Sequence, residues 1–177
     1  NPSDTKLLAI IANERGAQEA SSHERISILG YPFSISETFQ KRNTNHSLDA
    51  SLKLMEAVSK IVEQNKKQLR VYLSMGFGNP YGDTWSEDLL CTWVDRLNTH
   101  FPIHDFALSD TIAVATDAQC STLFHTLFKH FPKQTFSAHF HVVPGQEQKL
   151  IQAAYEAAGG IVTISAAHED GKADYSA

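Results

Sequence analysis

Apolar positions along this chain follow two different patterns. Short apolar runs predict buried strands, and we expect six of them, at residues 7–13, 26–34, 69–78, 104–114, 135–142 and 160–165. The run at 104–114 includes the exit loop of its strand. The longer segments between them, several with apolar residues at three- and four-residue spacing, predict helices at residues 14–24, 45–67, 86–100, 117–131 and 146–158. Ser47 and Ser86 stand at the starts of two of these helices and are predicted N-caps. Apolar strands that alternate with helices indicate parallel βαβ units.

Two α/β architectures accommodate such units, a doubly wound open sheet and a (β/α)8 barrel of the TIM type. A complete barrel has eight strands and roughly 250 residues, whereas this chain has 177 residues. As a barrel it would therefore be incomplete, with about six of the eight strands. No linker or low-complexity stretch interrupts the alternation, so we expect a single domain over residues 1–177.

Polar side chains follow most of the predicted strands at the point where each strand ends. They are Asn13, Ser34, Ser36, Glu37, Asn79, Tyr81, Asp110, Thr111, His139 and His141. Because the carboxyl ends of parallel strands meet at one edge, where sites are built in both architectures, these residues form a candidate site. Purely structural interpretations also stand, since Asn13 suits a helix cap, "NPYG" (79–82) suits a turn, and Asp110-Thr111 suits a strand exit.

The stretch "TFSAHFHVV", residues 135–143, places two histidines in an otherwise apolar strand. Side chains alternate between the faces of a strand, so His139 and His141 share one face with Ser137. Two imidazoles on one face offer adjacent ligands to a divalent cation and leave other positions for a carboxylate, water and substrate. Asp110, one strand away, suits a hydrogen-bonding or acid–base role. The pattern favours metal-assisted chemistry on an oxygen-rich small molecule.

Composition narrows the function classes further. The formal net charge of −5 argues against a nucleic-acid partner, because such proteins carry a basic surface. No apolar run approaches the ~20 residues of a membrane-spanning helix, and the two cysteines do not form a disulfide framework, which suits a cytoplasmic location. Glycine-rich phosphate loops, nucleophile elbows and dinucleotide fingerprints are absent from the sequence.

Four segments together resemble the hydroxymethylglutaryl-CoA lyase family, with bacterial members the most similar. They are "FSISETFQKRNTNHSLDASL", "LSMGFGNPYGD", "LSDTIAVAT" and "AHFHVVPGQ", within a resemblance that runs from about residue 7 to residue 158. Isopropylmalate and homocitrate synthases, in the wider superfamily of metal-dependent barrels, share the two-histidine strand. The resemblance implies a (β/α)8 barrel that cleaves 3-hydroxy-3-methylglutaryl-CoA, an acyl-CoA thioester, into acetyl-CoA and acetoacetate.

The resemblance also assigns roles to residues. It implies that His139 and His141 bind Mg²⁺ or Mn²⁺, that Asp110 and His139 are catalytic, and that the substrate pocket is lined by Asn13, Ser36, Glu37, Asn79 and Thr111. The chain departs from the family at Val142 and Asn79, where aspartate and cysteine are usual, and in a divergent tail at 161–177. The Arg-Asp pair of the family's first strand has no counterpart, so we expect the chain to cover strands three to eight.

Two other readings remain open. One is a different metal-dependent barrel enzyme, such as an aldol-type lyase, a decarboxylase or an acyl-CoA-condensing synthase. The other is a non-catalytic barrel fragment whose open sheet edge pairs with a second copy, giving a homodimer.

Overall fold

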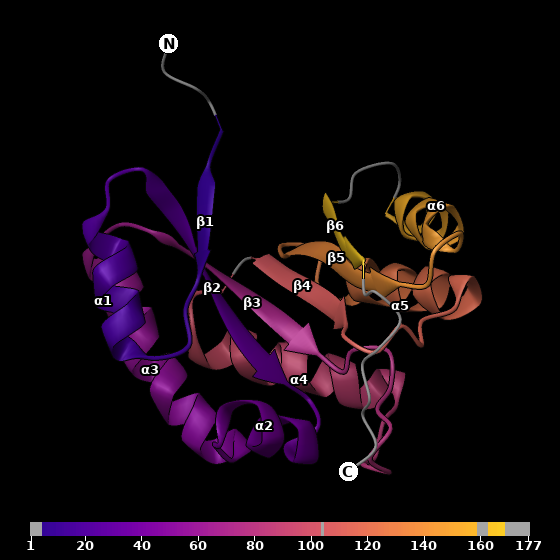
Figure 1. Cartoon of the computed structure of the whole chain (residues 1–177), viewed down its shortest axis with the longest axis horizontal. Helices are drawn as coiled ribbons and strands as arrows, with labels where there is room; N and C mark the ends of the chain where they lie inside the picture. The colour runs from indigo at the N-terminus through magenta and orange to yellow at the C-terminus, as the bar shows by residue number, and fades with distance from the viewer. Residues whose placement is uncertain (1–4, 104, 159–162, 169–177) are drawn as a thin grey trace.

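The structure, a computed structural model, describes residues 5–103, 105–158 and 163–168, the last range by its backbone (Figure 1). One parallel sheet runs through it in sequential order, from β1 to β6. Its strands are β1 (Leu7–Ile10), β2 (Ile26–Ser34), β3 (Gln68–Ser74), β4 (Asp105–Asp110), β5 (Thr135–Val142) and β6 (Thr163–His168). The helices are α1 (Glu14–Ser22), α2 (Glu37–Thr44), α3 (Leu48–Gln64), α4 (Glu87–His100), α5 (Asp117–His130) and α6 (Glu147–Ala157).

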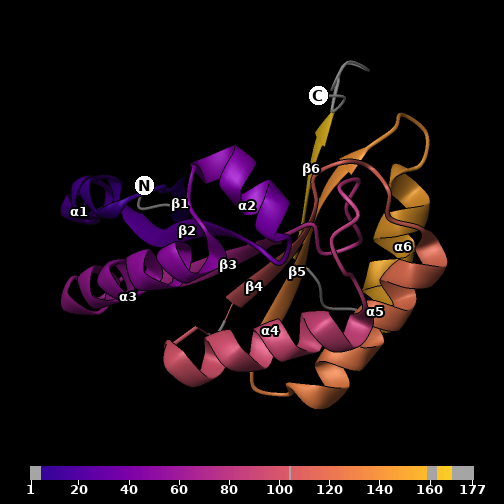
Figure 2. The ribbon, with the colours of Figure 1, turned by 90° about the horizontal axis from the view of Figure 1, so that it is seen from below.

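The strand order distinguishes between the two architectures. Each strand pairs with the next one along the chain, without the reversal of order that defines a doubly wound sheet. Figure 2 shows the sheet curled, with α1, α3, α4, α5 and α6 around its outside and α2 beyond the end of β2. The predicted incomplete (β/α) barrel is confirmed, since a barrel is built from successive βα units that curl in this way.

Each helix except α6 begins at a polar residue whose side chain accepts a hydrogen bond from a backbone N–H of the first turn. The hydroxyl of Ser47 accepts a hydrogen bond from Ala50 N, and that of Ser86 accepts one from Leu89 N, as the sequence predicted. Helix α2 was not predicted, because its segment has no apolar stripe and buries only Gln40. Its start is fixed instead by the cap at Ser36, and its end by Asn45 in the left-handed conformation at φ 57°.

The predicted boundaries shift at three strands. β1 ends at Ile10 and β3 covers Gln68–Ser74, so residues 11–13 and 75–78 of these two predicted strands lie in the loops that follow. β4 ends at Asp110, and the predicted exit loop follows it. β6 covers 163–168 rather than 160–165 and pairs in parallel with β5. Residues 160–162 of the predicted strand lie outside the described residues. Of the expected divergent tail at 161–177, only residues 163–168 are described.

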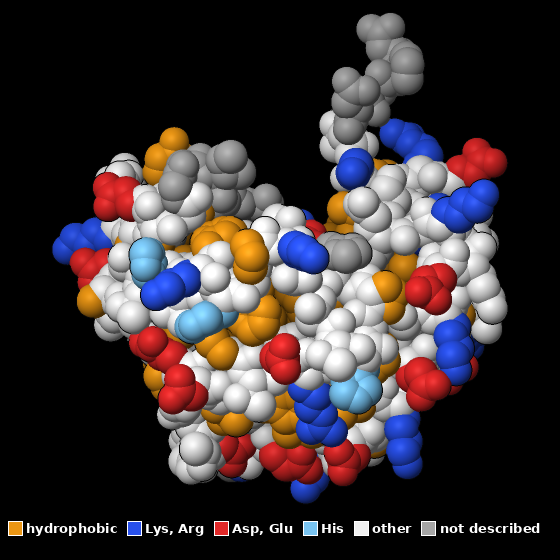
Figure 3. Space-filling view, turned by 180° about the vertical axis from the view of Figure 1, so that it is seen from behind, with side chains coloured by type: hydrophobic (Ala, Val, Ile, Leu, Met, Phe, Trp, Pro, Cys, Tyr) orange, Lys and Arg blue, Asp and Glu red, His pale blue; other side chains and the backbone are white. Residues whose placement is uncertain are grey.

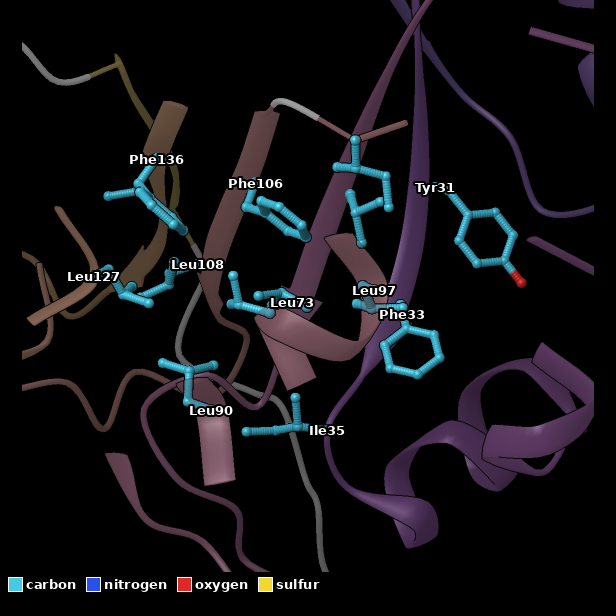
Figure 4. Close-up of a cluster of buried hydrophobic side chains, with 14 of the residues drawn as sticks. Tyr31, Phe33, Ile35, Leu73, Leu90, Leu97, Phe106, Leu108, Leu127 and Phe136 are labelled. Carbon is cyan, nitrogen blue, oxygen red and sulfur yellow. The ribbon is translucent and has the colours of Figure 1, made fainter. Parts of the chain in front are cut away.

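The core lies between the sheet and the outer helices. On β3, Leu69, Val71 and Leu73 are buried, whereas Arg70 and Tyr72, on the other face, are half-buried. Figure 4 shows Leu73 near Leu90 and Leu97 of α4, with Phe106 of β4 and Phe136 of β5 in the same cluster. We call the opposite face of the sheet, which carries Arg70 and Tyr72, the inner face.

One side of the molecule carries side chains of both charges. On the side shown in Figure 3, lysine and arginine side chains lie among aspartate and glutamate rather than in one basic stripe. None of the helices in the described part of the chain is both long and apolar enough to cross a membrane.

Candidate site at the carboxyl ends of the strands

The two histidines of β5 stand on the inner face near the strand's carboxyl end. Burial along β5 alternates as expected, with Phe140 fully buried against the helices and His139 and His141 half-buried. The two imidazole rings lie 5.3 Å apart between centroids, at 74° to each other. Both rings are therefore presented to the same space, as the period of two in the sequence predicted.

Strand register places His139 in a row of serines. Ser34 of β2, Ser74 of β3 and Ser109 of β4 stand side by side, and His139 follows on β5. All three serines are buried, and the Ser34 hydroxyl donates to Ser74 O at 3.3 Å. The site therefore rests on a layer of small polar side chains rather than the bulky branched residues that usually fill barrel interiors.

The environment of His139 favours a neutral imidazole. Burial lowers the pKa of His139 below its ordinary value, and the neighbouring His141 lowers it further. The ring of Tyr72, from the inner face of β3, meets that of His139 edge-on at a centroid distance of 5.6 Å. A neutral imidazole can serve as a metal ligand or accept a proton, which a charged one cannot.

Asp110 faces the helices rather than the inner face. It lies on the same side of β4 as Phe106 and Leu108, and it is 1% exposed. Its carboxylate accepts hydrogen bonds from the backbone N–H groups of Val114 and Ala115, at 3.1 and 2.7 Å, and a longer one from Ile112. Burial raises the pKa of Asp110, and these hydrogen bonds oppose the rise. The structure thus shows a strand exit whose loop is organised on a buried carboxylate, and the catalytic role of Asp110 stays a prediction.

Three further predicted residues are engaged in local structure. Asn13 is the N-cap of α1, where its side chain accepts from Gly16 N at 2.8 Å. Glu37 accepts from Leu48 N at 3.0 Å and pairs with Lys41 at 2.9 Å, and these contacts, Lys41 foremost, lower the pKa of Glu37. The Thr111 hydroxyl is 3.9 Å from the sulfur of Met75, at the start of the loop after β3. Their roles toward a substrate stay predictions.

Asn79 and Ser36 meet through a residue that sequence reasoning missed, Asp83. The Asn79 side chain accepts from Tyr81 N and Asp83 N, both at 3.1 Å, and donates to Asp83 O at 2.9 Å. The Asp83 carboxylate accepts from Ser36 Oγ at 2.5 Å and from the backbone and hydroxyl of Thr38. The only sequence signal was its place directly after "NPYG", where an aspartate is an ordinary turn residue.

The donor set for a divalent cation is partial within this structure. Two neutral imidazoles on one face suit such an ion, but in the described ranges no group of three or more His, Cys, Asp or Glu side chains is arranged to hold one. The histidines therefore fit a metal site whose remaining ligands lie outside the described residues or come from water and substrate.

Comparisons with known proteins identify relatives of this chain. No family model matches the chain. A hydroxymethylglutaryl-CoA lyase of Bacillus subtilis is 32% identical over 143 residues, which cover 77% of this chain and 45% of that protein. A 3-hydroxy-3-isohexenylglutaryl-CoA/hydroxymethylglutaryl-CoA lyase of Pseudomonas aeruginosa is 29% identical over 78% of this chain. The chain thus spans about half the length of the curated relatives that it matches.

Solved structures agree with the sequence relatives. The crystal structure of the Bacillus subtilis lyase matches 94% of this chain and 55% of its own, with a TM-score of 0.83 and 28% identity. A lyase from Acinetobacter baumannii in complex with coenzyme A and 3-methylmalate matches 95% of this chain, with a TM-score of 0.79 and 25% identity. Relatives by sequence and neighbours by structure thus name one family over most of the chain, the hydroxymethylglutaryl-CoA lyases, which fold as TIM barrels.

Proposed function

We propose that this chain supplies part of the active site of a carbon–carbon lyase that cleaves a 3-hydroxy-3-methylglutaryl-CoA-like thioester into acetyl-CoA and acetoacetate. The observation that carries the proposal is the pair His139 and His141 on the inner face, at the carboxyl edge of the strands, in a chain similar to such lyases. That edge is where catalytic residues of TIM barrels gather.

The reaction requires a proton acceptor near the 3-hydroxyl group of the substrate. Loss of that proton lets the hydroxyl carbon become the ketone of acetoacetate, while the electrons of the broken carbon–carbon bond pass to the thioester fragment. That fragment then takes up a proton to give acetyl-CoA. His139 suits the acceptor's place, because its lowered pKa leaves one ring nitrogen unprotonated at physiological pH. That single nitrogen would either accept the proton or bind a metal ion, so the two roles are alternatives for His139.

His139 and His141 are also the residues that would hold a divalent ion, Mg²⁺ or Mn²⁺. Such an ion, when bound, supplies positive charge that stabilises developing negative charge on substrate oxygens. The half-burial of both imidazoles strengthens this interaction, since water screens it less than at an open surface.

A Mn²⁺ titration followed by electron paramagnetic resonance tests the proposed site. We expect His139→Ala and His141→Ala each to weaken binding by more than about tenfold, because each removes one of few protein ligands. His125→Ala is the matched control, since His125 lies exposed on α5, and it should bind as the parent does. Equal affinity in all four proteins would remove the histidine pair from the metal site.

Turnover tests the activity itself. In the full-length protein, we expect His139→Ala to lower the rate of 3-hydroxy-3-methylglutaryl-CoA cleavage by far more than about tenfold. A panel of related 3-hydroxyacyl and 2-oxo acid substrates separates this lyase from the other metal-dependent barrel enzymes. A faster reaction with another member of the panel would replace the proposed substrate.

The location and assembly are proposed from the sequence and the two free thiols. Cys91 and Cys120 are both unpaired, which suits the reducing cytoplasm. A homodimer is the proposed assembly, and a molecular mass by light scattering that stays at one chain across protein concentrations would exclude it.

A further inference from the structure

The loop from Met75 to Ser86, which joins β3 to α4, starts at the carboxyl end of β3 and is anchored from several directions. We call it the β3–α4 loop. Near its start, Gln119 of α5 donates to Phe77 O at 2.9 Å, and the Phe77 ring lies 5.6 Å from that of Phe140. Phe140 is the strand residue between the two histidines. The position of this loop is therefore linked to the part of β5 that carries the site.

The other anchor of the loop is a single carboxylate, Asp83. Its two oxygens accept three hydrogen bonds from the first turn of α2, from Ser36 Oγ at 2.5 Å, Thr38 N at 2.9 Å and Thr38 Oγ1 at 2.8 Å. All three partners donate, so an acceptor-only carboxylate matches them. A negative charge is also favoured at the amino end of a helix. These hydrogen bonds, that from Ser36 first, hold the pKa of Asp83 below its ordinary value.

Aromatic contacts reinforce the same junction. The Tyr81 ring packs near Phe39 at a centroid distance of 6.4 Å, and the guanidinium of Arg42 lies 4.9 Å above it. Both partners belong to α2. The tip of the loop and the first two turns of α2 thus form one surface, although almost 50 residues separate Ser36 from Asp83 in the sequence.

We propose that Asp83 is a positioning residue, a latch that fixes the β3–α4 loop on α2 so that the two segments form one wall of the active site. This inference rests on the proposed function, because it takes the carboxyl edge of the strands, which both segments follow, as the place where a thioester substrate binds. Asp83 acts through two neighbours. Its carboxylate accepts a hydrogen bond from Ser36, and the side chain of Asn79 holds the backbone N–H and C=O of Asp83.

Hydrogen exchange measures the latch without reference to activity. In Asp83→Asn, one carboxylate oxygen becomes an amide NH2, which faces donors, so at least one of the three hydrogen bonds is lost. We expect the amides of Thr38, Tyr81 and Asp83, which donate hydrogen bonds at this junction, to exchange at least about tenfold faster, because a charge-assisted hydrogen bond is lost. Asp95→Asn is the matched control, because Asp95 lies exposed on α4.

A double-mutant cycle assigns the effect to the latch itself. Thr38→Val removes the hydroxyl that donates to Asp83. In the parent this change should speed exchange in the loop, whereas in Asp83→Asn it should add little, because the hydrogen bond is already weakened. Two effects that simply multiply would mean that Asp83 and Thr38 act independently, which overturns the latch. Unchanged exchange of the Thr38 amide in Asp83→Asn would overturn it as well.

Steady-state kinetics of the full-length protein test the positioning role. In Asp83→Asn we expect KM for the thioester to rise about fivefold or more with kcat within about twofold, the pattern of weakened substrate binding. Faster exchange with unchanged KM would overturn the positioning role. If the parent protein does not cleave the thioester at all, the proposed function fails, and the exchange data still decide whether the latch exists.

Discussion

Gly30 on β2 is the position where adding a single methyl group tests the packing of the inner face. An added Cβ would lie 2.8 Å from Cε2 of Tyr72 and 3.2 Å from Cδ2 of Leu8, and the first distance is shorter than side chains tolerate. Gly30 is not among the residues of positive φ, so alanine fits the backbone and only the contact opposes it. The absence of a side chain at Gly30 therefore gives the Tyr72 ring room to pack beside His139.

The cost of Gly30→Ala follows from two opposing effects. Overpacking of this kind typically costs about 1–3 kcal/mol, while the loss of chain entropy in the unfolded state returns about 0.4–1 kcal/mol. We expect a net loss of roughly 1–2 kcal/mol in the free energy of unfolding. For a chain of this size each kcal/mol corresponds to about 2–4 °C in Tm.

Urea denaturation followed by circular dichroism measures this difference, and Gly16→Ala on α1 provides the internal comparison. An added Cβ at Gly16 meets its nearest atom at 3.5 Å, an ordinary contact, so alanine should stabilise the helix by about 0.5–1 kcal/mol. The two glycines therefore predict changes of opposite sign. A Gly30→Ala protein as stable as the parent would refute the packing described for Tyr72.

Two further substitutions probe the opposite face of the sheet. Phe140→Ala should cost about 3–5 kcal/mol in the free energy of unfolding, because a fully buried ring is lost together with its contact to Phe77; a loss under about 1 kcal/mol in urea denaturation would contradict this packing. Tyr31→Phe removes the hydrogen bond to Ser51 O at 3.1 Å and should cost about 1 kcal/mol at neutral pH. Burial raises the pKa of Tyr31 from 10.0 to about 12, so the folded state keeps a proton that the unfolded state loses. The parent's stability should therefore fall between pH 10 and 12, relative to neutral pH, in a way that Tyr31→Phe does not share.

Much of this architecture can be predicted from local sequence. The order of strands and helices follows from the period of the apolar positions, and the sharing of one face by His139 and His141 follows from the period of two in a strand. Caps such as Ser47 are likewise local, because the hydroxyl and the N–H that it accepts are three residues apart.

Only the tertiary structure decided which partners the polar side chains in the loops meet. Asp110 precedes its own hydrogen-bond donors in a tight loop, and its place on the helix side of β4 depends on where the strand ends. Helix α2 lacks an apolar stripe, so its position depends on contacts with Asp83 and Tyr81, residues some 40 positions away. The period of the apolar positions predicts which residues are buried. The sequence around an aspartate in a turn, by contrast, does not indicate which distant donors its carboxylate will bind. The succession of strands and helices and the shared face of the histidine pair are therefore local properties of the sequence, whereas the sequential strand order and the junction of the β3–α4 loop with α2 are decided by tertiary contacts.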